Sequence, residues 1–587
     1  MGAILARRQA RTGCRIRARF ATPTAYQKVE FMLDFENRWD EQTGLYRIAP
    51  DRWGHSLDCF GRKDIHPLPD NAGFMIYAAQ TGQLAEVETA RILQNIRLCQ
   101  FTDPARRGQI KWFLEDQDRP DANAPFFICL GLIPLQKLYA DQLAPDSRAL
   151  LDEILAEVLH YFRRKADGTA YYYPNSYMGD LLFAWILNED YGTPDQEKQL
   201  LASLADAGAY WVDRHWGWGE HLSDSYSKVC CFELSLFLLL TRKLPADVRA
   251  LYMKALHQLL AIDDLYGGKP RVPALRSYAF EATPQTHSFR SLIRDWTPGE
   301  KVPLNNLPPL GQLLHRLDWH QLAPPPAPTP ATPPASIAVP CYNGTTAHAF
   351  IKKTFRIGAM SHFPVMEKTP YLPWQCFPVA FLHDDGDWGF LQWTSEEDGK
   401  TYAHPNHTKD YDIDRGLSAK VRPPITGTTC SLEHHGNLIV LRRMPSLSLS
   451  WTRFADRLRI VTPTAAWSEQ QLDDRCSTAC LTWPDGQMLS VARVTFSAVP
   501  KHKPAKIAAS FLDWELEYND FPGLNETVTL WAFAVDAKIT EPPRIVFENR
   551  RFRPADPEDR PFELQWQAGN HLWRLRADPV HDLLATR

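Results

Sequence analysis

The stretch Tyr210–Lys228 (YWVDRHWGWGEHLSDSYSK) concentrates reactive and aromatic side chains in one short segment. Three Trp, two Gly, two His and one Glu fall between Trp211 and His221. An ordinary connecting loop is rich in Gly, Pro, Asn and Ser and carries no such aromatic load. Aromatic faces stack on the C–H faces of pyranose rings, while imidazole and carboxylate groups act on hydroxyls or protons. The stretch is therefore predicted to form the floor of a carbohydrate active site.

Helical patterns flank this stretch and must position it. Asp195–Ala209 precedes it and Val229–Arg242 follows it, and apolar residues with helical spacing recur from about Tyr26 to Trp319. The other segments of this kind are Gly73–Gln100, Phe126–Leu143, Ser147–Lys165, Met178–Glu189, Gln196–His215 and Pro245–Ile262. Antiparallel helices joined by uneven loops can form a bundle, a solenoid or a closed α/α toroid. No fixed repeat period is visible, which argues against the solenoid.

Long aromatic and charged loops recur after pairs of these helices. They are Tyr46–Asp70, Lys111–Asn123, Tyr171–Tyr177, Trp216–Tyr226 and Gly267–Arg290. If the helices form a toroid, such loops gather at one end and line a cleft.

The helical signal ends at a Pro-rich segment. Pro324–Pro340 holds eight Pro in 17 residues, and this composition predicts an extended linker. Beyond it the apolar residues alternate, as in strands. The predicted strands include Val379–His383, Trp388–Trp393, Asn437–Met444, Ser446–Ala455, Arg457–Thr462, Phe562–Trp566 and Trp573–Leu575. We expect four regions: a poorly structured terminus (1–22), a helical domain (23–322), a linker (323–340) and an antiparallel β-sandwich (341–587).

Composition describes an ordinary globular chain of more than one domain. Of 587 residues, 44% are apolar and 23% charged, and the net charge of −4 gives no general case for nucleic acid or anionic membranes. The eleven Cys are scattered and predict free thiols. Residues 1–29 hold six Arg and no acidic residue, as in a transit peptide or a misassigned start. No run of signal-peptide or membrane-spanning length follows, so the compartment stays open, with a cytoplasmic location favoured.

A helical half, a Pro-rich linker and a β-sandwich half together resemble the polysaccharide lyases of the α/α-toroid type, namely the heparinase II/III-like and alginate-lyase-like families. In those families a toroid-loop His is followed fifty to sixty residues later by a Tyr, often near Arg. Here His221 is followed by Tyr278, 57 positions later (278 − 221), with Arg271 and Arg276 beside it. The families place an Asn before the His. Glu220 takes the adjacent position here, and Asn175 in YYYPNSY is the substitute.

The resemblance implies an N-terminal toroid catalytic domain that cleaves a uronic-acid-containing polysaccharide by β-elimination. Asn175, Arg271 or Arg276 would neutralise the uronate carboxylate, which makes the neighbouring C–H acidic. His221 would then act as base and Tyr278 as acid, with Tyr226 a rival proton donor. The expected substrate-binding residues are Trp53, His55, Arg62, Trp112, Tyr173, Trp216, Trp218, Glu220 and Tyr226. An acidic polysaccharide or oligosaccharide is the expected partner, and no cofactor, metal, nucleic acid or membrane is expected.

Other interpretations stay open. A glycoside hydrolase on the same fold would need two carboxylates, and Glu115, Asp116, Glu220 and Asp224 are available. A non-catalytic polysaccharide-binding protein would use the same aromatic loops. Arg271 and Arg276 could be ion-pair partners, and the Trp residues could pack between helices. His404, His407, His434 and His435 match no zinc spacing and are interpreted as surface residues.

Overall fold

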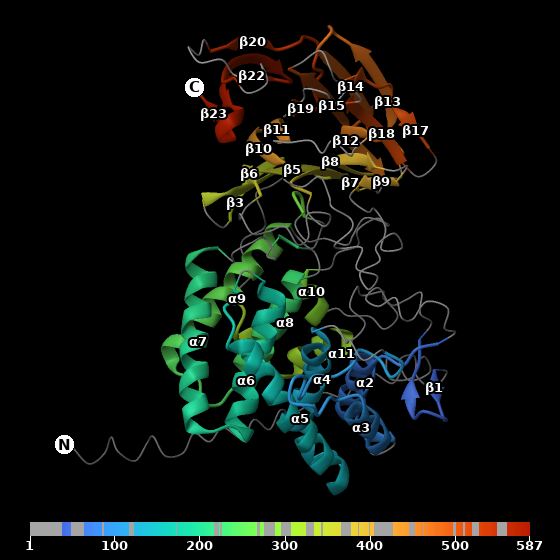
Figure 1. Cartoon of the computed structure of the whole chain (residues 1–587), viewed down its shortest axis with the longest axis vertical. Coiled ribbons are helices and arrows are strands. Elements are labelled where there is room, and N and C mark those ends of the chain that lie inside the picture. The colour runs from blue at the N-terminus through green and yellow to red at the C-terminus, as the bar shows by residue number, and fades with distance from the viewer. Residues whose placement is uncertain are drawn as a thin grey trace, which may run out of the picture.

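The computed structural model has a helical part followed by a part made of sheets (Figure 1). It describes residues 38–48, 64–84, 87–116, 122–171, 173–215, 222–223, 226–266, 271–274, 288–294, 307–324, 334–341, 344–364, 377–384, 387–397, 400–403, 427–444, 452–461, 463–496, 501–508, 511–518, 527–548 and 560–587. Within these residues, no helix is both long and apolar enough to cross a membrane. The predicted domain boundaries at 22, 322 and 340 stay predictions.

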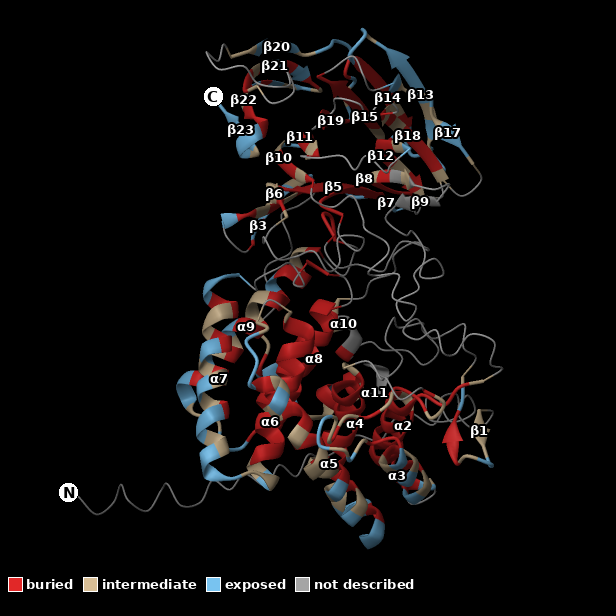
Figure 2. Cartoon of the chain, in the orientation of Figure 1, coloured by how far each residue is buried: buried red, intermediate tan, exposed pale blue. Residues whose placement is uncertain are grey.

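The helices alternate between two environments. α2 (Leu68–Thr81), α4 (Ala124–Tyr139), α6 (Pro174–Tyr191) and α8 (Tyr226–Leu240) are buried on nearly all sides. Between them, α3 (Thr89–Leu98), α5 (Pro145–Ala166), α7 (Pro194–Asp213) and α9 (Ala246–Tyr266) bury one face and expose the other. Figure 2 shows this contrast between α8, which is buried along its length, and the exposed outer side of α7. The helices α2, α4, α6 and α8 therefore form an inner layer. The helices α3, α5, α7 and α9 form an outer layer.

Hydrogen bonds at their ends show that neighbouring inner helices are parallel. Near the C-terminus of α6, Glu189 accepts from Thr241 Oγ1 and from the Arg242 backbone, 52 and 53 positions later. At the other end, Ser176 Oγ donates to Asn123 Oδ1 (2.8 Å), which joins the starts of α6 and α4. Because an outer helix returns the chain between each inner pair, the inner helices all start at the same end.

The last helices bring the chain back to the first. α10 (Phe289–Arg294) and α11 (Leu307–Arg316) are followed by the 3₁₀ turn η6 (Trp319–Gln321). Arg316 donates to the Gln80 carbonyl at the end of α2 (2.7 Å), and the Trp319 indole donates to Ser235 Oγ of α8 (2.8 Å). The segment from α11 to η6 thus contacts both the first and the last helix of the inner layer.

The C-terminal part contains three antiparallel sheets among its described residues. The largest runs β16 (Lys501–His502), β18 (Phe511–Tyr518), β12 (Arg453–Val461), β8 (Trp388–Glu397), β7 (Val379–His383), β5 (Phe355–Met360), β4 (Thr346–Ile351) and β3 (Ala335–Pro340). In addition, β17 (Lys506–Ile507) pairs with β18, and β9 (Lys400–Ala403) pairs with β8. The second runs β13 (Ala466–Gln471), β14 (Cys476–Thr482), β15 (Met488–Thr495), β19 (Thr527–Val535), β11 (Asn437–Met444), β10 (Thr428–His434) and β6 (His362–Phe363). The third is β20 (Arg544–Phe547), β21 (Phe562–Ala568), β22 (His571–Asp578) and β23 (Leu583–Thr586).

These sheets stack in three layers. One apolar core, which includes Phe355, Leu458 and Trp531, lies between the first and second sheets. Another, which includes Leu530, Trp566 and Trp573, lies between the second and third. The predicted antiparallel β architecture is confirmed, and the sandwich has a third layer that the alternation of apolar residues did not reveal.

Several predicted elements have different limits in the structure. Gly73–Gln100 was predicted as one helical segment, but it contains two helices, because Gly82 ends α2 in the left-handed region (φ 72°). Ser446–Ala455 and Arg457–Thr462 were predicted as separate strands, whereas β12 runs unbroken from Arg453 to Val461. Ala335–Pro340 was assigned to the linker and instead forms β3, which pairs with β4 along its whole length. An edge strand tolerates Pro340, since Pro has no N–H to donate to the ladder.

The two parts of the chain pack against each other. Ala274 and Phe377 form an isolated antiparallel bridge, and their side chains lie in a cluster with Val272, Trp388 and Phe390. A second cluster joins Leu222 and Tyr266 of the helical part to Met360 and Phe363 of the sheets. The end of the helical part that holds the start of α8 and the end of α9 therefore faces the largest sheet (Figure 1).

Candidate active site

The starts of the inner helices meet at the end that faces the sheets. Leu222, four residues before α8, packs against Met360 and Phe363, and the parallel arrangement puts the starts of α4 and α6 at the same end. The first N–H groups of a helix have no partner within the helix, and the helix dipole favours negative charge there. This end is therefore suited to anionic groups.

At the start of α6, Pro174 occupies the first turn, where its missing N–H costs nothing. Asn175 follows and is fully buried, while Tyr173 is half-buried. Ser176 ties this turn to Asn123 at the start of α4. The sequence had placed Asn175 in a loop, but the structure puts it in the first turn of a helix.

The start of α8 is held by serine hydroxyls. Ser223 Oγ accepts from the Tyr226 backbone N–H (3.1 Å), and Ser227 Oγ donates to the Ser223 carbonyl (2.7 Å). Tyr226 itself is 7% exposed. The offset of 52 to 53 positions between α6 and α8 puts Asn175 level with Ser227 or Lys228. Asn175 and Tyr226 therefore lie at the same level of two adjacent helices.

Arg271 supports this turn. It is buried, donates to the Ser223 carbonyl (3.1 Å) and pairs with Asp263 (3.3 Å), which also accepts from the Phe289 N–H. Of the two roles considered for Arg271, ion-pair partner is the one that these contacts describe. Its charge is balanced by Asp263 and its hydrogen bond holds the segment that leads into Tyr226.

A second buried charged side chain, that of Lys228, lies in the first turn of α8. Lys228 is 6% exposed. Burial raises the pKa of the nearby Cys231 thiol well above its usual value, with Asp263 acting in the same direction, while Arg271 and Lys228 oppose them. This thiol therefore stays protonated and is inert as a nucleophile. Ser223 and Lys228 fall within the stretch Tyr210–Lys228, but neither was assigned a role of its own, because a single Ser or Lys carries no signal of where its side chain points.

A second buried polar group lies before α2. His66 is flanked by two carboxylates, with Nδ1 2.5 Å from Glu115 Oε1 and Nε2 3.1 Å from Asp40 Oδ2. Burial lowers the pKa of His66, but the hydrogen bond and charge of Glu115, together with Asp40, outweigh it and hold that pKa above its usual value. The same contacts hold the pKa of Glu115 below its usual value, although burial opposes them.

Two of the four carboxylates considered for a hydrolase, Glu115 and Asp116, lie within the described residues. A general acid needs a raised pKa, whereas that of Glu115 is lowered. Asp116 is buried and accepts from the Trp112 backbone N–H (3.1 Å). Both carboxylates make structural contacts.

Like Asp180 on α6, Asp70 in the first turn of α2 has a perturbed carboxyl. Burial raises its pKa to about 7, and Arg38 opposes the shift. A carboxyl group that titrates near neutrality is a candidate for proton transfer where a substrate can reach it. The sequence predicted nothing for Asp70, because an Asp in the first turn of a helix usually faces water.

Trp112 was predicted to stack on sugar, and its ring instead belongs to the apolar core of the helical part, as does that of Tyr226. Trp112 is 4% exposed and its ring lies 5.1 Å from that of Phe127. Tyr173 keeps partial exposure at the start of α6 and is compatible with sugar contact.

The other predicted site residues lie outside the described residues. They are His221, Tyr278, Arg276, Trp53, His55, Arg62, Trp216, Trp218, Glu220 and the alternative carboxylate Asp224. His404 and His407 also lie outside them, while His434 stacks on His571 (4.0 Å between ring centroids). Among the residues that are described, no group of three His, Cys, Asp or Glu side chains is arranged to hold a metal ion.

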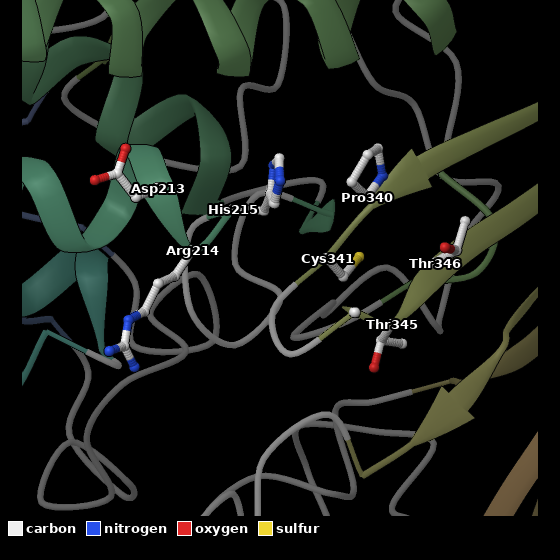
Figure 3. A pocket seen from close by; sticks show the side chains of 8 residues that line it. Asp213, Arg214, His215, Pro340, Cys341, Thr345 and Thr346 are labelled. Atoms are coloured by element: carbon white, nitrogen blue, oxygen red, sulfur yellow. The ribbon is translucent and has the colours of Figure 1, made fainter.

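A cavity of about 460 Å³ lies between the end of α7 and the β3–β4 turn. Its lining is Asp213, Arg214, His215, Pro340, Cys341, Gly344, Thr345 and Thr346. Figure 3 shows His215 between the end of α7 and the strands that carry Pro340 and Cys341, whereas the Arg214 side chain extends away from those strands. His215 has a left-handed backbone (φ 51°) and directly precedes Trp216. The cavity therefore adjoins the chain segment that the sequence singled out.

Comparison with solved structures finds two described as heparinase III. One aligns over 96% of this chain and 92% of its own length, at 10% identity and a TM-score of 0.47. The other, a heparinase III with methylated lysines, aligns over 96% and 93% at 10% identity and a TM-score of 0.39. No protein-family model matches the sequence, and no curated protein matches it.

Proposed function

We propose that this protein is a polysaccharide lyase that cleaves a uronic-acid-containing polysaccharide or oligosaccharide by β-elimination, with the active site at the starts of α6 and α8. The proposal is supported by the hydrogen bonds of Glu189, which align α6 with α8 and so put buried Asn175 level with the first turn of α8. The contacts of the α11–η6 segment with both α2 and α8 support a closed α/α toroid as the scaffold.

The chemistry needs three functions. The proton α to the uronate carboxylate is removed, a C=C bond forms, and the bond to the 4-linked oxygen breaks as that oxygen takes a proton. The α proton is weakly acidic until the carboxylate is neutralised, because negative charge builds on its oxygens. Asn175 donates a hydrogen bond to that carboxylate, next to two helix starts whose dipoles favour the same charge.

Proton transfer falls to a phenol and an imidazole. Tyr226 is the phenol in the first turn of α8, the helix next to that of Asn175, and His221 precedes it by five positions in the sequence. Tyr278, predicted from its spacing to His221, is the other phenol in this proposal. Arg276 is the remaining candidate cation, since the charge of Arg271 is balanced by Asp263.

The test is turnover on acidic polysaccharides, followed by ultraviolet absorbance, because elimination creates an unsaturated product and hydrolysis does not. Tyr226→Phe, Tyr278→Phe and His221→Ala are compared with Tyr177→Phe. The Tyr177 hydroxyl bonds the Ala166 and Gly168 carbonyls inside the fold, so this variant controls for loss of a buried phenol. The proton donor is the tyrosine whose change cuts kcat by roughly 10²- to 10⁴-fold without unfolding the chain. Products that lack the absorbance, or full activity in both Tyr226→Phe and Tyr278→Phe, would overturn the mechanism.

A further inference from the structure

The four-stranded sheet β20–β23 has one face in the core and one in water. Trp566 and Leu564 of β21, and Trp573 and Leu575 of β22, point into the core below the second sheet. Alternate residues along a strand point to opposite faces, so Gln565 and Arg574 point outward. Both are exposed, as is Arg544 on β20. Figure 2 shows this sheet at the end of the molecule remote from the helices.

The outward residues form a cross-strand row. Arg544 is directly opposite Gln565, and Gln565 is directly opposite Arg574. Neighbouring strands lie about 5 Å apart, which puts the two arginines about 10 Å apart at their backbones. The row therefore presents guanidinium, amide and guanidinium groups in line.

The arginines on either side of this row form ion pairs. Arg576, also on the outer face, forms a two-pronged pair with Glu548 (2.7 and 3.3 Å), and Arg587 pairs with Glu563. Among the described residues, neither Arg544 nor Arg574 has an acidic partner within ion-pair distance. Two guanidinium groups without an ion-pair partner among the described residues thus lie on one face of a sheet, in a chain whose net charge is −4.

We infer that this face, defined by Arg544, Gln565 and Arg574, is a second binding surface for an acidic polysaccharide, separate from the active site. Guanidinium groups bind carboxylate or sulfate in a two-pronged geometry, and the amide between them bonds a hydroxyl. Exposed Val546 (52%) and Leu572 (42%) flank the row and provide apolar contact for sugar rings. The identity of the polymer rests on the proposed function.

The advantage of such a surface is retention. A polymer bound at two places on one protein rebinds at the first site before it escapes from the second, which raises apparent affinity without new contacts at the active site. A short oligosaccharide cannot reach both sites and gains nothing. Polymer length therefore separates the effect of this face from catalysis.

The test uses the full chain and the double variant Arg544→Ala/Arg574→Ala. Retention on immobilised alginate and heparan sulfate is measured at low and at physiological salt, and kcat/KM is measured on tetrasaccharides of each. We expect retention of the better-bound polymer to weaken at least about fivefold at low salt, with kcat/KM on the tetrasaccharide unchanged. The control, Arg97→Ala/Arg106→Ala, removes two charges from the helical part, where both arginines pair with acidic residues, and should retain polymer like the wild type.

The possible outcomes separate this proposal from the proposed function. Wild-type retention that the double variant loses, without any turnover, supports this face and overturns the lyase. Turnover with equal retention by the wild type and the double variant overturns this face and leaves the lyase. An equal loss in the control variant, or stronger retention of wild type by double-stranded DNA than by either polysaccharide, would also overturn this face.

Discussion

Gly179 on α6 lies directly against the side chain of Glu233 on α8. A Cβ built on this glycine would lie 2.8 Å from Glu233 Oε1 and 3.2 Å from the Phe126 ring. Glu233 is fully buried. Both helices are fixed at their C-terminal ends by Glu189, so the contact sets how closely they approach one turn below Asn175.

Gly179→Ala should push α6 and α8 apart. The added methyl would have to displace the fully buried Glu233 carboxylate and press on the Phe126 ring, and overpacking of this kind costs about 1–3 kcal/mol of unfolding free energy. The denaturant midpoint measures the loss. Gly208→Ala on the outer helix α7 is the control, because its Cβ would meet the Tyr252 ring at 3.3 Å and it gains helix propensity. A Gly179→Ala protein as stable as Gly208→Ala would contradict the tight contact.

Asn175→Ala should cut turnover by about 10²-fold or more, because it removes a donor from the position where charge develops. Asn175→Asp should be worse, since a carboxylate repels the uronate. Steady-state kcat on the cleaved polymer is the measurement. Asn188, buried at the opposite end of the same helix, provides the control: Asn188→Ala removes a buried amide of equal size and should keep kcat. Equal losses in both variants would point to a folding effect.

Asp70 should make the stability fall as pH rises. Burial raises the pKa of this carboxyl to about 7, above the ordinary value of 3.8, so the folded chain keeps a proton that the unfolded chain releases. The contribution of Asp70 to the free energy of unfolding is full below pH 3.8. As the pH rises towards 7, the free energy of unfolding falls by up to about 1.4 kcal/mol per pH unit. Asp70→Asn should remove that slope and unfold at higher denaturant than wild type at pH 8. An unchanged slope in Asp70→Asn would assign the effect to other groups.

The ion pair between His66 and Glu115 should stabilise the folded chain only within a bounded pH range. The pKa of His66 is raised on folding. Its contribution to the free energy of unfolding is therefore full below pH 6.5 and is lost as the pH rises through the pKa of the folded state. Glu115 has a lowered pKa, so its contribution is present above 4.5 and is lost as pH falls through the folded value. The melting temperature of His66→Gln should therefore fall furthest below that of wild type between about pH 4.5 and 6.5. A deficit that stays constant from pH 5 to pH 9 would contradict the ion pair.

The sequence predicted helices and strands correctly where one face of the element is exposed to solvent. The outer helices α5 and α7 show helical spacing because water meets one side of each, and β21 and β22 alternate for the same reason. The predicted strands Val379–His383 and Trp388–Trp393 are found as β7 and β8, which pair antiparallel.

The ends of the inner helices were harder to predict. Because α6 is buried on almost every side, its apolar residues show little periodicity, and the predicted helix began at Met178, four residues after the observed start at Pro174. That error left Asn175 in a loop. Trp112 was misassigned because an aromatic residue in a charged loop looks the same whether its ring faces water or Phe127. Contacts over long sequence distances, such as Asp263 with Arg271 and Phe289, leave no local pattern.

The bond between Arg316 and the Gln80 carbonyl, 236 positions apart, has a consequence for biosynthesis. As the nascent chain leaves the ribosome, α2 emerges early with apolar residues on every side, but the segment that covers one flank emerges only after more than two hundred further residues. At about 5–20 residues per second, that flank stays uncovered for roughly 10 seconds or more. Production of this protein should therefore respond to chaperone supply and to translation speed.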